Sequence, residues 1–521
     1  MQLALPAPHH TETTDAALTN SQALNGIYFG ALLDVYWEIL AQLPAPHKAP
    51  SKGHFPLSDR EKESAVTGNL MHGEQPKRFF YNNKKNSSQA TILSLRSAPE
   101  LRSLQTDRAM QLHLTPLLAL YFSAAILLTG HGMQLGLVPL LAKSEGFSSI
   151  DIGFMGAAYF AGYLAGCIVI PRFISWVGHV RVFLVLIAVA TAALLSLTLA
   201  SSFILWFFCR ALVGFCLAGI YMVIESWLNE AATRENRGVI LAAYTIITLA
   251  AIALGQLFLT ASVTYPKLVT LAAIAILLGA IPVGFSRSPS PQPVEAFRLR
   301  FGSSFKRARV AFIGALCCGL VTSSYWSMGS FIAQSLGLSN ESVILFMIAP
   351  MIGGALVQLP VGRWSDSTDR RKVLLGLASL AAVVSFTAII GPTETQAFTV
   401  IIMALFGAAT FPMYGISLAH ANDSSSFSVV QTASAILLIY SLGAILGPIV
   451  VSIGHTLTPK AMFWLTLIVM APLAAWILLR IQDHDPNQTH FEPFLAAPVS
   501  SQEVFQLSEN NPSSDGPKPS D

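Results

Sequence analysis

Charged residues are scarce in this sequence. Asp, Glu, Lys and Arg make up 11% of its 521 residues, whereas hydrophobic residues make up 53%. Soluble globular domains carry about 25% charged residues, so this composition excludes an ordinary soluble protein and indicates an integral membrane protein. The formal net charge is only +3, which gives no reason to expect a nucleic-acid partner.

The sequence also lacks the common signatures of catalysis. It contains no HExxH motif, no GxSxG elbow, no phosphate-binding loop ending in GK[ST] and no GxGxxG after a strand. We therefore expect neither an enzyme nor a cofactor. The cysteines are few and all lie in apolar segments, which excludes a disulfide framework or a zinc-ligand spacing and favours burial in a membrane. They are Cys167, Cys209, Cys216, Cys317 and Cys318.

Long apolar runs begin at Leu114 and are each long enough to cross a hydrocarbon layer about 30 Å thick. They predict an all-α membrane protein with twelve transmembrane helices. These are placed at residues 115–139, 151–173, 181–201, 203–228, 238–261, 267–286, 309–333, 341–361, 372–391, 397–420, 426–453 and 460–480. The longest interior connection divides them into six and six, as two fused repeats would.

The predicted domains are two six-helix bundles, a basic linker and two tails. Their respective boundaries are residues 113–286 and 309–481, residues 287–308, and residues 1–112 and 482–521. Both tails are polar and rich in Pro and Ser, so we expect them to be largely disordered. An alternative for the first tail is that translation starts at Met110, which would leave the upstream segment without a function.

Lys and Arg are unequally distributed between alternate loops. Because basic residues are retained on the cytoplasmic side, the bias predicts that both termini are cytoplasmic. One set of loops holds fifteen basic residues and the opposite set holds Lys143, Lys267 and Lys460. The larger set is Arg172, Arg181, Arg234, Arg237, Arg287, Arg298, Arg300, Lys306, Arg307, Arg309, Arg363, Arg370, Arg371, Lys372 and Arg480.

Arg210 lies inside the fourth predicted helix, about 10 Å from its start at Phe203 at about 1.5 Å per residue. A charged side chain at this depth is costly and usually has a function. One interpretation is that Arg210 faces a cavity, where it serves an anionic group or changes the proton affinity of a neighbour. The other is a structural tie to backbone carbonyls of a neighbouring helix, with nearby glycines allowing close packing.

The same region carries a family resemblance. Arg210, Gly214 and the Ala218-Gly219 pair form an RxxxGxxxG pattern that resembles the fourth helix of major facilitator superfamily (MFS) transporters. The run Glu225-Ser-Trp-Leu-Asn, followed by Asn236-Arg237-Gly238, resembles the YcaD-like branch. The resemblance covers about residues 113 to 481.

The resemblance implies two six-helix bundles that expose a midplane site alternately to the two sides of a bacterial inner (plasma) membrane. The expected function is secondary active transport of a small solute by a monomer, with proton coupling as one possibility. The alternatives are a transporter-like sensor or assembly partner without flux, and a lipid flippase. The expected partners are the solute, the lipid bilayer and protons.

Residues 362–371 read GRWSDSTDRR and are similar to the MFS signature G-x-x-x-D-R-x-G-R-R. The corresponding region one repeat earlier has Pro171 in place of the glycine and Ser175 in place of the aspartate. The resemblance implies that Asp366 docks near the start of helix five, where free amides would stabilise its carboxylate. An alternative is that these charges only solvate a loop and set the topology. The predicted gating residues are Glu225, Arg237, Gly362, Asp366, Arg370 and Arg371.

Helices one, four, seven and ten are expected to line the cavity in the arrangement that the resemblance implies. The predicted pathway residues are His131, Gln134, Arg210, Ser323, Tyr325, Trp326 and Tyr414, a set whose aromatic rings and hydroxyls suit an amphipathic small solute. His131 could couple a proton or serve only as a hydrogen-bonding group. We expect Glu225 to pair with Arg172, Arg181 or a residue of the signature at residues 362–371, rather than to carry a proton during transport.

Overall fold

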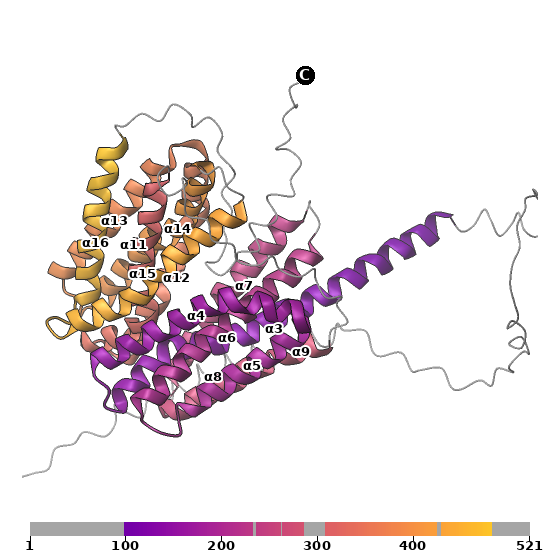
Figure 1. The fold of residues 1–521 in the computed structure, drawn as a ribbon, viewed down its shortest axis with the longest axis horizontal. Helices are drawn as coiled ribbons and strands as arrows, with labels where there is room; N and C mark the ends of the chain where they lie inside the picture. Colours follow the sequence, from indigo (N-terminus) through magenta and orange to yellow (C-terminus); the bar gives the residue numbers. More distant parts are fainter. Residues whose placement is uncertain (1–97, 233–235, 262, 286–307, 425–428, 482–521) are drawn as a thin grey trace, which may run out of the picture. The chain divides into compact units, whose positions relative to one another are not determined.

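The computed structural model describes residues 98–232, 236–261, 263–285, 308–424 and 429–481 (Figure 1). All regular structure in these ranges is helical, and twelve helices or helix pairs are long and apolar enough to cross a membrane. The predicted all-α class with twelve spans is confirmed. Residues 1–97, most of the linker and the tail from 482 lie outside the described residues.

The first six spans form one bundle. They are α3 (Ala98–Ser144), α4 (Ser149–Val177), α5 (His179–Ser196), α6 (Phe203–Ala231), α7 (Arg237–Leu257) continued by the 3₁₀ turn η1 (Phe258–Thr260), and the pair α8 (Tyr265–Leu278) and α9 (Ala280–Phe285). Helix α3 begins at Ala98, so residues 98–112, which we assigned to a disordered tail, are helical. This stretch is rich in Leu, Ala, Arg and Gln, which are strong helix formers, and its one proline, Pro99, stands in the first turn, where proline is tolerated.

The second six spans form the other bundle. They are α11 (Arg309–Ser335), α12 (Asn340–Ser367), α13 (Arg370–Ile390), α14 (Gln396–Ser424), α15 (Val429–His455) and α16 (Ala461–Ile481). Helix α12 continues through Ser367, so Gly362 and Asp366 lie on a helix and not in the loop that we predicted. The turn begins later because the Asp369 carboxylate caps α13 by accepting from the Arg371 amide, which leaves only Thr368 and Asp369 between the helices.

The two bundles repeat the same local structures at a constant offset. Gly146 and Gly337 both have a left-handed backbone, with φ of 87° and 80°, and residue 337 is 191 positions after 146. Two residues after each glycine, Ser148 and Ser339 cap α4 and α12. The same offset of 191 separates the two copies of the signature at 171 and 362. The bundles are therefore two copies of one six-helix unit.

Close backbone contact joins α4 to α6 and α12 to α14. A Cβ on Gly162 would lie 1.8 Å from the Ala211 carbonyl oxygen, and one on Gly353 would lie 1.9 Å from that of Ala404. Gly353 is again 191 residues after Gly162. Small residues allow membrane helices to approach this closely, where van der Waals contact rather than the hydrophobic effect holds them together.

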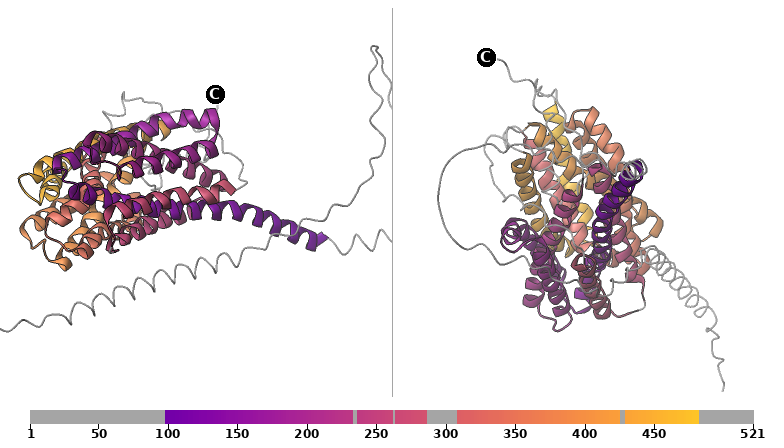
Figure 2. Two further views of the ribbon diagram at one scale, coloured as in Figure 1. Left: turned by 90° about the horizontal axis from the view of Figure 1, so that it is seen from below. Right: turned by 90° about the vertical axis from the view of Figure 1, so that its right-hand side faces the viewer.

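Contacts between the bundles involve mainly α4 with α15 and α3 with α11. Ser330 Oγ donates to the Gly136 carbonyl at 2.6 Å, and Gly153 packs against Ser452. These contacts lie in the halves of the helices next to the turns at residues 145–148 and 336–339. Toward their other ends the two bundles diverge, as the different directions of α4 and α14 in Figure 1 show. The first turns of α3 project beyond the remaining helices (Figure 2).

Gly214 tests the close packing of α4 and α6, because a Cβ there would lie 2.0 Å from the Tyr159 carbonyl oxygen. We expect Gly214→Ala to lower the free energy of unfolding by about 1–3 kcal/mol, since the helices would have to separate. The thermal unfolding midpoint of the purified protein measures this. Gly284→Ala is the matched control, because no heavy atom lies within 4 Å of a Cβ at that position. Equal midpoints for the two variants would contradict the packing argument.

Candidate functional site

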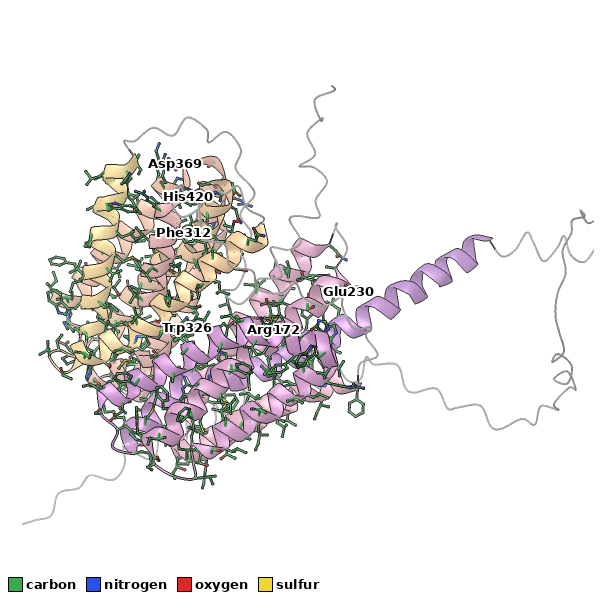
Figure 3. All side chains as sticks on the ribbon, viewed as in Figure 1. Arg172, Glu230, Phe312, Trp326, Asp369 and His420 are labelled. Atoms are coloured by element: carbon green, nitrogen blue, oxygen red, sulfur yellow. The ribbon has the colours of Figure 1, made fainter. Side chains whose placement is uncertain are left out.

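A cavity of about 190 Å³ lies between the two bundles. This is below the roughly 300–1,000 Å³ typical of sites for drug-sized molecules, so it suits a smaller solute. Helices α3, α4, α6 and α7 line it from the first bundle, and α11 and α15 line it from the second. The lining residues are His131, Leu135, Tyr159, Phe160, Tyr163, Tyr221, Thr248, Ile252, Trp326, Leu437, Tyr440 and Ser441. Figure 3 shows Trp326 where the bundles meet.

Aromatic rings bearing hydroxyl or N–H groups dominate the lining. Tyr159 lies 6.4 Å from Tyr163 and 5.2 Å from Phe160 between ring centroids, so α4 presents a continuous aromatic face. Tyr440 and Trp326 contribute aromatic rings from the second bundle. Among the lining residues there is no carboxylate. Such a surface can stack on a planar solute and donate hydrogen bonds to it.

Three side chains form a buried relay beside this cavity. Arg210 Nη1 donates to Gln134 Oε1 at 2.5 Å, and Gln134 Nε2 lies 3.0 Å from His131 Nδ1. Guanidinium groups only donate hydrogen bonds, so Gln134 must accept with its oxygen and donate with its nitrogen. His131 Nδ1 is therefore the acceptor, and a neutral His131 carries its proton on Nε2.

Arg210 is only 3% exposed, and its guanidinium stacks on the Tyr159 ring at 4.7 Å. No carboxylate among the described residues pairs with it. The guanidinium binds side chains of α3 and α4 rather than backbone carbonyls, which differs from the structural tie considered above. Arg210 is also not one of the residues that line the cavity, so it does not face the cavity directly as the other interpretation expected. The glycines of α6 contribute indirectly, because Gly214 brings the α4 backbone at Tyr159 against α6. The structure thus joins the predicted residues His131, Gln134 and Arg210 in one network.

Of the predicted residues on α11, only Trp326 lines the cavity. Its ring stacks on Phe411 at 5.7 Å. The Tyr325 side chain instead lies inside the second bundle, where its hydroxyl donates to the Met347 carbonyl. Ser323 is fully buried and donates to the Leu320 carbonyl within its own helix. Neighbouring positions on one helix face different directions, and this separates Tyr325 from Trp326.

Helix α14, the tenth span, contributes no lining residue, unlike our prediction. Tyr414 lies one layer behind the cavity, with its ring 5.0 Å from that of Tyr440. The missed lining residues come mainly from α4, α7 and α15. A signal for α4 was present in the sequence, because Tyr159 and Tyr163 are four residues apart and therefore share one helix face.

Glu225 is buried in the same bundle, with 1% of its surface exposed. It interacts electrostatically with Tyr163, Tyr221, Tyr244 and Cys167. Tyr163 and Tyr221 also line the cavity, so Glu225 acts electrostatically on residues of the cavity wall. The expected pairing with Arg172 or Arg181 is absent among the described residues, where both arginines are exposed. Pairing of Glu225 with a residue of the signature at 362–371 stays a prediction.

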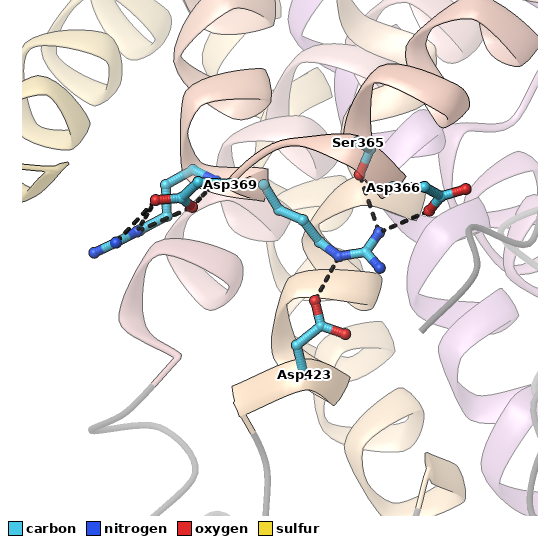
Figure 4. A network of polar contacts seen from close by, with 6 residues as sticks. Ser365, Asp366, Asp369 and Asp423 are labelled. Carbon is cyan, nitrogen blue, oxygen red and sulfur yellow. Dashed lines mark hydrogen bonds and ion pairs between the residues drawn. The ribbon is translucent and has the colours of Figure 1, made fainter. Parts of the chain in front are cut away.

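The signature residues form a charge network at the end of the second bundle (Figure 4). Arg370 is buried, and its Nε donates to Asp423 Oδ2 at 2.5 Å. Its Nη1 donates to Ser365 Oγ at 3.0 Å and lies 3.7 Å from Asp366 Oδ1. The network ties α12, α13 and α14 together. The side chains at positions 237 and 238, where we expected Asp366 to dock, lie outside the described residues.

Asp369 caps α13 and pairs with Arg371 at 2.9 Å between Oδ2 and Nη2. Burial alone would raise the pKa of the Asp369 carboxyl, but hydrogen bonds from the Arg371 side chain and amide outweigh this and lower it below the usual value. The carboxylate therefore contributes stability above its unfolded-state pKa, and this contribution is lost as the pH falls through the lower folded-state value. In the ranges that the structure covers, no group of His, Cys, Asp or Glu could hold a metal ion.

Comparison with known sequences identifies a matching protein family and related proteins from bacteria. The sequence profile of the Major Facilitator Superfamily matches residues 120–310 and 311–512. An MFS-type transporter YcaD from Escherichia fergusonii is 30% identical over 347 residues, which cover 66% of this chain and 87% of the relative. YcaD from Salmonella arizonae is 29% identical over 348 residues, with the same coverage of both chains.

Solved structures show the same fold at low sequence identity. A bacterial homologue of the human lysosomal transporter Spinster, in an inward-facing and occupied conformation, superposes with a TM-score of 0.59 at 15% identity, over 71% of this chain and 96% of that one. The nucleoside transporter NupG superposes with a TM-score of 0.56 at 16% identity, over 70% of this chain and 99% of that one.

Proposed function

Because this chain belongs to the major facilitator superfamily of membrane transporters, we propose that it carries a small solute across the membrane by alternating access. The solute site is the cavity between the bundles. The observation that carries this proposal is that both halves of the protein line one aromatic cavity while their mutual contacts are concentrated toward one end. Rocking one bundle against the other would then expose the site to the opposite side.

The described conformation is open toward the cytoplasm in this proposal. The bundles diverge at the ends that carry Arg172 and Glu230 in one and Asp369 and His420 in the other (Figure 3). These ends belong to the loops with the larger set of basic residues, which are retained on the cytoplasmic side. The tight contacts around Gly136 and Gly153 then form the outer seal. Both termini are cytoplasmic in this orientation, and the relatives named from bacteria favour the inner membrane.

We propose that Asp366 forms a contact, called the latch, that stabilises the state in which the cytoplasmic ends of the bundles are closed (the inward-closed state). Its side chain is 38% exposed and lies at the end of α12, where it contacts Arg370 at 3.7 Å. When the cytoplasmic ends approach each other, its carboxylate can reach the start of α7 and interact with the free amides there. The signature of the first bundle has Ser175 at the corresponding position, so the latch is one-sided.

Glu225 is the proposed proton-binding group for coupling to a proton gradient. It is buried next to the tyrosines of the cavity wall, where the charged and neutral forms of a carboxyl differ strongly in solvation energy. His131 is less suited, because its Nδ1 already accepts from Gln134 and a second proton there would break the relay. This assignment departs from the sequence-based expectation that Glu225 pairs with a basic residue rather than carrying a proton, and it favours the alternative in which His131 serves only as a hydrogen-bonding group.

Alternating access predicts two distances between the cytoplasmic ends of the bundles. Arg172 and Arg363 are exposed, are 191 residues apart and so occupy corresponding positions in the two repeats. Spin labels on Arg172→Cys and Arg363→Cys in lipid vesicles should show a long and a short population by pulsed electron resonance. The native cysteines are buried, which limits labelling elsewhere. Labels on Arg172→Cys and Arg181→Cys, within one bundle, are the control and should show one distance. A single distance for the first pair contradicts the proposal and favours a sensor.

Asp366→Asn should increase the population with the long distance between the labels. The substitution removes the latch, which stabilises only the inward-closed state with the short distance. A helix-terminus interaction of about 0.3–2 kcal/mol corresponds to a change of about two- to thirtyfold in the ratio of the populations. Glu394→Gln is the matched control, since Glu394 is an exposed carboxylate near the opposite end of the second bundle. An unchanged ratio in Asp366→Asn would show that Asp366 is not a latch.

Glu225→Gln should remove the pH dependence of the same distances. If Glu225 binds a proton with different affinity in the inward-open and inward-closed states, the ratio of these two states in the wild-type protein changes by up to about tenfold per pH unit. The measurement compares about pH 5 with about pH 8 in vesicles. Glu230→Gln on the same helix is the control, because Glu230 is exposed. A pH response retained in Glu225→Gln would exclude Glu225 as the proton-binding group.

A further inference from the structure

The Arg210–Gln134–His131 relay fixes where a hydrogen-bond donor enters the cavity. Arg210 can only donate, so each bond in the relay has one possible direction, and His131 Nδ1 must accept. The proton of the neutral imidazole is then on Nε2. His131 lines the cavity, and its Nε2 bonds to no residue in the described part of the chain. Nε2–H is therefore an available donor at the solute site.

The relay also brings an uncompensated positive charge close to the cavity. Arg210 has no carboxylate partner among the described residues, and its contacts are the Gln134 oxygen and the Tyr159 ring. Glu225, on the same helix, is fifteen residues away, about 22 Å along the axis at about 1.5 Å per residue. A buried charge without a partner is strongly unfavourable, so a ligand that carries the opposite charge would gain more here than it would in water.

The two side chains whose rings contact His131 are uncharged tyrosines. Tyr159 of α4 stacks near its ring at 6.5 Å, and Tyr221 of α6 meets it edge-on at 6.0 Å. Helix α7 presents Thr248 and Ile252 to the same cavity. Aromatic faces alone also attract cations, but the nearby guanidinium repels them. The combination of rings, one directed donor and a positive field favours a planar anion.

We propose, building on the proposed transport function, that the solute is a small organic anion with a planar ring, such as an aryl carboxylate. The ring lies among Tyr159, Tyr221 and Trp326, and the carboxylate accepts from Nε2–H of His131. Gln134 is a positioning residue that touches no solute. It keeps the imidazole in the donating tautomer and links it to the Arg210 charge. The cavity volume of about 190 Å³ fits about one ring and a short side chain.

Matched probes test the charge of the solute. Benzoate, phenylacetate and 3-phenylpropionate are compared with their neutral amides and with the corresponding amines, by calorimetric titration of the purified full-length protein. We expect at least one acid to bind about tenfold or more tightly than its amide, as for a hydrogen bond to a charged group. Tighter binding of the amines or amides, or failure of all three acids to bind, overturns the anion assignment.

Flux separates this inference from the proposed function. Vesicles containing the protein are tested for exchange of the radiolabelled acid that binds best. Acid-selective binding without exchange supports the anion site and contradicts transport. Exchange of an amine in preference to the acid supports transport and overturns the anion site.

Variants of two buried glutamines test the positioning role. Gln134→Leu should weaken binding of the acid by about tenfold or more and binding of the amide less, because the amide carbonyl can also accept from Nε2–H but gains nothing from the Arg210 charge. Gln256→Leu is the matched control: Gln256 is equally buried and donates to the Gly132 carbonyl at 2.8 Å, outside the relay. It should keep the preference for the acid. An equal loss of acid and amide binding in Gln134→Leu would show a merely structural role and overturn the assignment.

Discussion

A guanidinium that lies inside an apolar bundle must find its partners within the protein, and this constraint organises the first bundle. Arg210 meets it with the Gln134 oxygen from α3 and the Tyr159 ring from α4, without a carboxylate. Satisfying one charge thus holds three helices in register. The same contacts orient His131 and one wall of the cavity. The same contacts therefore determine both the polar chemistry of the site and the packing of its helices.

The second bundle meets a similar constraint at a different place. Its buried arginine, Arg370, lies at the end of the bundle and is bound by Asp423 and Ser365. The two repeats share their capping turns and their helix-packing glycines at an offset of 191 residues. Their buried arginines, Arg210 and Arg370, do not follow this symmetry. The repeated features are those that any six-helix unit needs to pack, whereas the unrepeated ones lie at the solute cavity or at the proposed gate.

The cavity is correspondingly asymmetric. The first bundle supplies the histidine and three of the tyrosines, and the second supplies mainly Trp326, Tyr440 and Ser441. In alternating access, a solute held chiefly by one bundle stays in place while the other bundle moves across it. The relay connects only helices of the first bundle, so the rocking motion would leave it intact. In this proposal the first bundle therefore holds most of the polar and aromatic contacts to the solute, and the second bundle closes over them.

The sequence alone determined the membrane class and the twelve spans, because hydrophobic length is a local property that the bilayer makes decisive. It also indicated the division into two repeats, through the position of the basic linker and the spacing of the two copies of the signature. It also singled out Arg210, His131 and Gln134, because polar groups are conspicuous in apolar helices. Only the tertiary structure decided that these three form one directed relay, that Tyr159 and Tyr440 line the cavity while Tyr325 and Tyr414 do not, and that Asp366 lies on a helix. Those outcomes depend on how each helix is rotated about its own axis, and that rotation is set by contacts between segments far apart in the chain.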